Sequence, residues 1–595
     1  MADPKPEFRS AWEFSRFEEL WERFSPLTPQ GKDEKEEREV VSDAGRLREI
    51  YDGTEAAIAL LRSMSGSEAD TLAYRLRRLP RLPFEDGSDP FALDLVGLFL
   101  VKKFLSNYRA ILKVLDDGLR LRFGLAFEST VLAAELDRGG SDPETFAVSD
   151  RFDPALPELR AAIARTDAAI ASSRAATKAA ALRERGLDFG SRGFLVLPHE
   201  RAALLLEPGP GKTCAFSVEA YDGASCIVRI QQPESELLLE EERAALGARE
   251  RELEEAVIAR LSALVAAEAG RLSGYARAIG EFDLARARAV LAVELELSRP
   301  LLSGTGSEAA GPGAAGPGTA GPEGAAAQRS TPAASTLAIE GGRHVGCEWD
   351  CARRGVAYAP LDLEIPEAAA AIFGSNMGGK TVALRTVAFL QIAAQAGLFV
   401  PARSFNSCVY SAVACLGEGT PRGGARGAGA SGAAQGARGA APDDEGGLSG
   451  FGFEIRAFAE AWDLARRGPT LVIMDEFART TGSAEAEAII AAALAALSSR
   501  PGTRCLISTH FAGLERSPGT AYLRMKGLDK DAAKAALAAE EPLPERIRRI
   551  NGMMRYELER DSGERQGSDA LAVARLLGLD PLIARDAERR WKERT

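Results

Sequence analysis

The tripeptide Gly-Lys-Thr, which ends many phosphate-binding loops, occurs twice in this chain of 595 residues. The later copy lies in GSNMGGKT (374–381), which has the spacing of a glycine, four residues and then Gly-Lys-Thr. In such a loop, backbone N–H groups form a nest for phosphate oxygens, the lysine reaches the outer phosphates, and the hydroxyl ligates Mg²⁺. A strand-like run precedes the loop and a helix-like run follows it, so the N-terminus of that helix would face the phosphates. We therefore expect the nucleotide to be bound by Gly374, Ser375, Asn376, Met377, Gly378, Gly379, Lys380 and Thr381.

The earlier copy, in LEPGPGKTCAF (206–216), does not fit the same pattern. Leu206 stands where the first glycine is needed, and Pro208 and Pro210 remove two of the N–H donors that a phosphate nest requires. The residues that follow are typical of a strand and not of a helix. We expect this copy to be a turn in a β element.

Three further side chains could act on a bound nucleotide. The apolar run TLVIMDE (470–476) predicts a buried strand that ends in Asp475 and Glu476, at the edge where parallel sheets bind ligands. There Asp475 can hold Mg²⁺ and Glu476 can polarise the attacking water. A second strand, CLISTHF (505–511), places His510 at its end, where it could sense the outermost phosphate or position water. The expected catalytic residues are thus Glu476, His510 and Lys380, and the expected Mg²⁺ ligands are Thr381 and Asp475.

The elements around these residues fall into two classes. After residue 337, strand-like and helix-like runs alternate, which predicts an α/β domain with a mainly parallel sheet. Before residue 303, the runs 42–64, 94–123 and 237–297 have helical periodicity, and the last is long enough to form a lever or coiled coil. Between them, residues 193–233 are typical of a small β element.

Two segments rich in Gly, Ala and Pro interrupt this pattern, at 303–335 and 417–447. Neither can bury enough apolar surface to offset the entropy of ordering. We expect the first to be a flexible linker and the second to be an expanded, disordered surface loop of the α/β domain.

The N-terminus, the apolar runs and the cysteines indicate in which compartment the protein works. The N-terminus lacks the apolar core of a signal peptide, and no apolar run reaches the ~18 residues needed to span a bilayer, so we expect a cytoplasmic protein without membrane contact. The seven cysteines form no disulfide framework, as in a reducing compartment. His344, Cys347 and Cys351 lie close together, but no second ligand cluster completes a metal site.

The loop and the segments after it resemble the MutS ATPase family. NMGGK and AQAGLFVPA (394–402) are far more specific than a generic phosphate loop, and LSGFGFEI (448–455), STHF (508–511) and GGRHV (341–345) resemble further family segments. The resemblance implies ATP and Mg²⁺ as cofactors, a homodimer, and a Ser449 that reaches the nucleotide of the other subunit. Glu454 matches the acidic residue of the same signature.

The resemblance also implies a division of the chain. It gives an N-terminal extension (1–25), a helical lever core with a small β element (26–302), a linker (303–337), a P-loop ATPase domain (338–545) and C-terminal dimerisation helices (546–595). From this division, we expect a protein without the mismatch-reading and connector domains and without a nuclease-like domain after the ATPase domain. This chain departs from the family pattern at three places: Ser375 replaces a proline, Gly450 replaces a threonine, and ARTTG (478–482) replaces the usual segment after Glu476. We expect the change at ARTTG to affect the coupling between subunits.

Two clients remain open for such an ATPase. One is duplex DNA held in a clamp, as in the binding of mismatched or branched DNA during repair or recombination. The other is a protein, since MutS-like ATPases without DNA-reading domains resemble the one encoded beside adenosylcobalamin-dependent lysine and ornithine aminomutases, which is thought to be part of a reactivase. Residues 231–300 hold 14 acidic and 9 basic side chains, a net charge of −5, which disfavours DNA. The formal net charge of the chain, −12, does not favour DNA either. We therefore lean towards the remodelling of an aminomutase-type partner.

Overall fold

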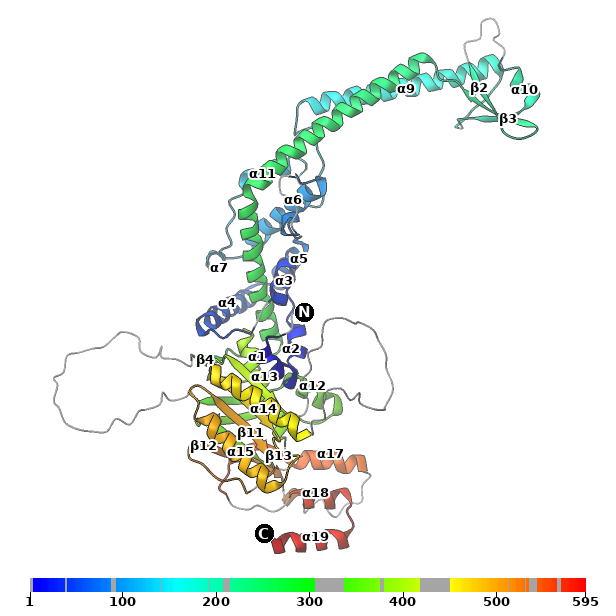
Figure 1. The fold of residues 1–595 in the computed structure, drawn as a ribbon. Helices are drawn as coiled ribbons and strands as arrows, with labels where there is room; N and C mark the ends of the chain where they lie inside the picture. The colour runs from blue at the N-terminus through cyan, green and yellow to red at the C-terminus, as the bar shows by residue number, and fades with distance from the viewer. Residues whose placement is uncertain are drawn as a thin grey trace, which may run out of the picture. The chain divides into compact units, whose positions relative to one another are not determined.

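The computed structural model describes residues 4–37, 40–86, 92–140, 142–191, 193–206, 215–304, 336–374, 379–417, 450–511, 513–529, 531–533, 543–563 and 569–594 (Figure 1). The chain divides into two compact units. One unit comprises residues 1–27, 31–69 and 280–595, and the other comprises 28–30 and 70–279. Both expected Gly-, Ala- and Pro-rich segments fall almost entirely outside the described residues, as does the earlier Gly-Lys-Thr.

A six-stranded sheet forms the centre of the first unit, with the strand order β13-β12-β7-β11-β10-β9. All neighbouring pairs are parallel except β12 and β13, so the expected α/β domain with a mainly parallel sheet is present. The strands are β7 (Ala369–Phe373), β9 (Ala412–Leu416), β10 (Thr470–Asp475), β11 (Arg504–Thr509), β12 (Thr520–Leu528) and β13 (Met554–Arg560).

Both faces of this sheet are covered, which explains the continuous apolar runs in its sequence. Every residue of β7, β9, β10 and β11 is buried. Helix α13 (Lys380–Gln395) packs on one face, whereas α14 (Gly450–Arg467) and α15 (Ser483–Ser498) pack on the other. Successive β7 residues alternate between the two cores, with Ile372 in one and Phe373 in the other.

The N-terminal segment belongs to the same core as α13. Aromatic side chains of α1 (Pro6–Phe14) and α2 (Glu18–Arg23), and of the residues that flank them, are buried in the core that contains α13. The ring of Phe17 lies 5.8 Å from that of Phe389 on α13. Helices α3 (Pro29–Glu37) and α4 (Ala44–Ser63) follow, and Tyr51 of α4 donates a hydrogen bond to the carbonyl oxygen of Ala394. The expected N-terminal extension is therefore part of the compact unit that holds the sheet.

A second sheet of the first unit has the order β4-β8-β5-β6. Its strands are β4 (Leu301–Ser303), β5 (Leu337–Gly342), β6 (Leu361–Ile365) and β8 (Ser404–Cys408), and helix α12 (Val345–Arg354) connects β5 to β6. The C-terminal part consists of α17 (Leu543–Met553), β13, α18 (Asp569–Leu577) and α19 (Pro581–Arg594). Strand β13 falls within a segment that we expected to be helical. It is a strand because Met554, Tyr556 and Leu558 alternate with polar residues and pack towards the sheet.

The second unit is mainly helical. Helix α11 (Glu234–Glu294) has 61 residues, and those up to Ile279 belong to this unit. Helix α9 (Ala155–Arg185) contacts α11 through ion pairs of Arg160 and Arg174. The expected β element is present as an antiparallel sheet with the order β1-β3-β2. The other elements of the second unit are α5 (Gly66–Arg78, from Asp70 onward), η1 (Pro83–Asp86), α6 (Leu95–Leu112), α7 (Asp117–Arg122), α8 (Thr130–Asp137), β1 (Leu195–Pro198), α10 (His199–Ala203), β2 (Phe216–Ala220) and β3 (Ser225–Ile230). Among the described residues, no helix is long and apolar enough to cross a membrane.

His344 joins the N-terminal segment to α12. Its Nδ1 accepts a hydrogen bond from the backbone N–H of Cys347, capping α12, and its Nε2 lies 2.7 Å from the carbonyl oxygen of Ser15. Because Nδ1 accepts and Nε2 faces a carbonyl oxygen, this pair of contacts requires the neutral ring with its proton on Nε2. Burial lowers the pKa of His344 from 6.5 to about 4.

This depressed pKa predicts a loss of stability in mild acid. The unfolded chain takes up a proton at His344 below pH 6.5, whereas the folded chain does so only near pH 4. The stability contributed by the neutral ring is therefore complete above pH 6.5 and is lost as the pH falls towards 4. By linkage, we expect the first unit to be about 2 kcal/mol less stable at pH 5 than at pH 8. Urea unfolding at both pH values measures the difference. The variant His344→Gln, whose amide keeps a donor towards Ser15, should show a smaller difference in unfolding free energy between the two pH values. An equal difference in that variant would show that His344 does not cause the pH dependence.

Candidate nucleotide-binding site

The ends of three neighbouring strands bring the predicted residues to one edge of the sheet. Strands β7, β11 and β10 are adjacent and parallel, so their carboxyl ends lie together. Gly374 follows β7, Asp475 ends β10, and His510 follows β11. The pairing of these strands in the sheet therefore assembles the site. Their order in the sheet differs from their order in the sequence.

Lys380 begins helix α13 and is buried, with 3% of its surface exposed. Its ammonium group donates a hydrogen bond of 2.6 Å to the carbonyl oxygen of Gly374, and its Nζ lies 3.7 Å from Oε1 of Glu476. Burial lowers the pKa of Lys380, although the nearby carboxylates of Glu476 and Asp475 oppose this shift. A cation held at a helix N-terminus beside a glycine-rich loop is suited to phosphate oxygens.

Two glycines of the loop have backbone angles that favour glycine. Gly374 has a φ of 155° and Gly379 a φ of 86°, and Gly379 caps α13 in the left-handed conformation. A Cβ atom at Gly379 would lie 2.8 Å from the ring of Tyr556, and one at Gly374 would lie 3.1 Å from Cβ of Met525. These positions therefore require glycine both for conformation and for space.

Ser508, which the sequence motifs do not mark as a site residue, links the two acidic residues. This fully buried serine of β11 donates a 2.6 Å hydrogen bond to Oδ1 of Asp475 and accepts a 2.9 Å bond from the backbone N–H of Glu476. Glu476 has a φ of 54°, which is unusual for a residue other than glycine. Such strain at a strand end is typical of functional sites. In the sequence, the only signal was the position of Ser508 next to Thr509 and His510.

Glu476 also contacts a second cation. Its Oε2 lies 3.6 Å from NH1 of Arg479, while Oε1 faces Lys380. Its side chain is 16% exposed, which leaves the carboxylate accessible at the edge of the sheet. Thr381, the expected metal ligand, is half-buried directly after Lys380.

Glu454 positions the loop that follows Glu476. From α14, its carboxylate accepts hydrogen bonds from the backbone N–H of Ala478 (2.8 Å) and the hydroxyl of Thr480 (3.5 Å). Burial raises the pKa of Glu454. The ARTTG segment is thus held by α14, although it departs from the family pattern.

The remaining expected residues differ in how the structure places them. His510 is exposed, and its ring packs against Phe511 with 4.1 Å between ring centroids. Ser375, Asn376, Met377, Gly378 and Ser449 lie outside the described residues. Among the described part of the chain, no group of three or more His, Cys, Asp or Glu side chains could hold a metal ion, and this includes the region of His344, Cys347 and Cys351.

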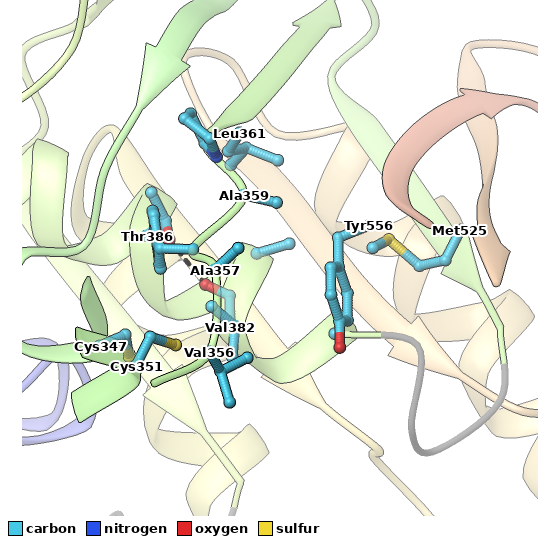
Figure 2. Close-up of a pocket in the computed structure, with 14 residues that line it drawn as sticks. Cys347, Cys351, Val356, Ala357, Ala359, Leu361, Val382, Thr386, Met525 and Tyr556 are labelled. Atoms are coloured by element: carbon cyan, nitrogen blue, oxygen red, sulfur yellow. Dashed lines mark hydrogen bonds between the residues drawn. The ribbon is translucent and has the colours of Figure 1, made fainter. Parts of the chain in front are cut away.

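A cavity of about 160 Å³ adjoins the phosphate loop (Figure 2). One wall is formed by the first two turns of α13, and another by the segment 356–361, which leads into β6. Helix α12 and the strands β12 and β13 complete the lining. Tyr556 of β13 faces the cavity, opposite α12 in Figure 2. Nothing in the sequence indicated Tyr556, because its position depends on β13 pairing with β12. The lining residues include Cys347, Cys351, Val356, Val382, Met525 and Tyr556.

The chain is similar to DNA mismatch repair proteins. It is 30% identical over 356 residues to the DNA mismatch repair protein MutS of Paracoccus denitrificans, covering 58% of this chain and 32% of that protein. It is 30% identical over 283 residues to MutS of Granulibacter bethesdensis, covering 46% and 24% of the two chains. It is 27% identical over 262 residues to MutS of Thermus aquaticus, covering 41% and 29%. The chain thus spans about a third or less of the length of these curated relatives. No protein-family model matches the chain.

Proposed function

From the similarity to MutS proteins, we propose that this chain is a MutS-like protein that binds and hydrolyses ATP at the carboxyl edge of its six-stranded sheet. The observation that carries the proposal is the meeting of Lys380, Asp475 and Glu476 at one sheet edge, beside the glycine-rich loop. Phosphoryl transfer requires a cation for the phosphates and a carboxylate for the attacking water, and this edge supplies both.

Each residue has a distinct role in this proposal. Lys380 neutralises charge on the outer phosphates, and its present contact with the Gly374 carbonyl keeps the ammonium group aimed at the loop. Glu476 orients the attacking water and accepts its proton, while Ser508 holds the backbone that carries Glu476. His510 contacts the outermost phosphate or its water.

The oxygen donors of this edge fit Mg²⁺, which prefers carboxylate and hydroxyl ligands. Thr381 and Asp475 would hold the ion, which would supply neutralisation of the phosphate charge. The hydrogen bond from Ser508 fixes the orientation of the Asp475 carboxylate for that purpose.

We propose that the base of the nucleotide occupies the cavity beside the loop. Gly379, at the end of the loop, lines the cavity. A base in the cavity would therefore be close enough to stay joined to phosphates bound by the loop. Its walls are mainly apolar, and Tyr556 offers an aromatic face on which a base can stack.

We further propose a homodimer in which Ser449 of each subunit completes the site of the other. This role of Ser449 rests on the family resemblance. Exposed apolar side chains on α18 and α19 support self-association through the C-terminal helices, since Leu577, Leu582 and Ile583 are 39%, 77% and 58% exposed.

For the client, we favour a protein over duplex DNA. The β element of the second unit exposes large apolar side chains, which suit a protein surface better than a phosphate backbone. The protein client that the resemblance implies is an adenosylcobalamin-dependent aminomutase, whose reactivation would be driven by ATP turnover. The exposed side chains are Phe194, Val196, Leu204, Leu206 and Tyr221.

The DNA clamp remains the alternative, and one structural observation weakens the charge argument against it. Acidic residues of α11 are neutralised within the second unit, where Arg160 contacts Glu250 and Glu254, and Arg174 contacts Glu236 and Glu240. The net charge of −5 over residues 231–300 therefore overstates the acidity of the helix surface. The relatives are DNA mismatch repair proteins, which favours the same alternative.

The client is tested by the steady-state ATPase rate of the purified chain with each candidate added. We expect an aminomutase holoenzyme to raise the rate and duplex DNA to leave it unchanged. The matched variant Leu204→Ser/Tyr221→Ser should lose stimulation by the aminomutase and keep the basal rate. Stimulation by mismatched or branched DNA that disappears at high salt would instead establish the clamp. A chain that neither binds nor hydrolyses ATP would refute the proposed activity itself.

A further inference from the structure

Two cysteine thiols line the cavity beside the phosphate loop. Cys347 and Cys351 lie four residues apart on α12, so their side chains share one face of the helix. Figure 2 shows both sulfur-bearing side chains on the wall opposite Tyr556. Each is half-buried and is in contact with the cavity.

The other free cysteines that the structure describes are shielded. Cys226, Cys408, Cys415 and Cys505 are all buried, whereas Cys347 and Cys351 are intermediate. Burial raises the pKa of the Cys505 thiol to about 12 and that of Cys415 further still. Because the thiolate is the reactive form, burial makes the thiols of Cys415 and Cys505 unreactive towards solutes. Within the described residues, the thiol chemistry of the first unit is thus concentrated at the cavity.

We propose that Cys347 and Cys351 form a thiol-modification site, at which a low-molecular-weight disulfide closes the cavity to its ligand. An adduct on either cysteine would occupy part of this cavity of about 160 Å³ and would compete with a second ligand for the space. The modification as such depends only on the two thiols and the cavity. That the excluded ligand is ATP rests on the proposed function.

The reaction is a thiol–disulfide exchange. A cysteine thiolate attacks one sulfur of the disulfide RSSR, a new protein S–SR bond forms, and RS⁻ leaves and takes up a proton. Cys351 is the expected entry point, because burial raises the pKa of the Cys347 thiol. Arg16 and Arg385 act in the opposite direction on Cys347 without reversing the shift.

The helix disfavours a second exchange that would join the two cysteines. Residues four apart on a helix hold their Cβ atoms about 5–6 Å apart, whereas a disulfide needs roughly 3.5–4.5 Å. Joining Cys347 to Cys351 would therefore distort the last turns of α12. We expect the mixed disulfide to be the main product, and an excess of a dithiol reductant to reverse it.

The test combines peptide mapping with nucleotide binding. The full chain is incubated with oxidised glutathione, its adducts are located by mass spectrometry, and the affinity for a fluorescent ATP analogue is measured before and after dithiothreitol. We expect an adduct at Cys351, an affinity at least 10-fold weaker, recovery on reduction, and protection of both thiols by prebound analogue. The affinity of Cys347→Ser/Cys351→Ser for the analogue should be the same before and after glutathione treatment, whatever its starting value, whereas Cys505→Ala should lose affinity on treatment as the parent does.

Each other outcome separates this proposal from the proposed ATPase. An adduct at Cys347 or Cys351 that leaves affinity unchanged would overturn closure of the cavity, and the lack of an adduct at both thiols would overturn the modification site. If the reduced parent binds no analogue, the proposed function fails, and the adduct map alone then decides the modification site.

Discussion

Replacement of Glu476 by glutamine is expected to lower the rate of ATP hydrolysis by roughly 10²–10⁴-fold, the range typical for loss of a general base. Glutamine keeps the size of the side chain and can keep the backbone hydrogen bond to Ser508, but it cannot accept a proton from water. It also removes the negative charge beside Lys380, 3.7 Å away, so the phosphates lose a repulsive neighbour. ATP should therefore bind at least as tightly to the variant as to the parent.

Slow hydrolysis with intact binding has a second consequence. If ATP closes a dimer, Glu476→Gln should accumulate the ATP-bound dimer, which sedimentation measures against the ADP-bound and nucleotide-free protein. Glu460→Gln, the same change at an exposed position of α14, is the matched control and should turn over ATP at the parental rate. Parental turnover in Glu476→Gln would remove Glu476 from the catalytic role.

The sequence predicted the strands and helices of the site well, because each is short, apolar and bounded by clear signals. The run TLVIMDE became β10 with Asp475 at its end, and the helix after the loop became α13. The sequence placed Asp475 and Glu476 at a ligand-binding strand end, and the structure puts Glu476 3.7 Å from Lys380 because β7, β11 and β10 end at one edge of the sheet. The mechanism assigned to these residues stays a prediction.

The sequence could not predict contacts that depend on distant pairing. Tyr556 reaches the cavity only because β13 joins the sheet next to β12, and Ser508 meets Asp475 only because β11 lies beside β10. Burial of the N-terminal aromatic residues likewise depends on α13, more than 300 residues later. The net charge counted over residues 231–300 overstated the acidity of the α11 surface for a similar reason. Arginines of α9 form ion pairs with acidic residues of α11, and these pairs depend on the fold.

Replacement of Lys380 by methionine should cost more in nucleotide affinity than any other single change in the described part of the site. Lys380 is the buried cation nearest the loop, and a charged hydrogen bond in such a position contributes roughly 1.5–3 kcal/mol, with long-range attraction added. We expect the dissociation constant for ATP to rise on the order of 10²-fold, about 2.7 kcal/mol. Methionine preserves the volume of the side chain, so the packing at the start of α13 is retained.

Thermal unfolding gives a readout of this loss that does not need hydrolysis. At a ligand concentration of about 100 times the dissociation constant, binding stabilises the parent by about 2.7 kcal/mol, whereas a 10²-fold weaker site gains only about 0.4 kcal/mol. ATP should therefore raise the melting temperature of the parent and barely change that of Lys380→Met. Lys526→Met is the matched control, since Lys526 is exposed on β12 and pairs with Glu557. An equal ATP-induced shift in parent and Lys380→Met would mean that the nucleotide binds elsewhere, because an occupied loop cannot lose its buried cation without losing affinity.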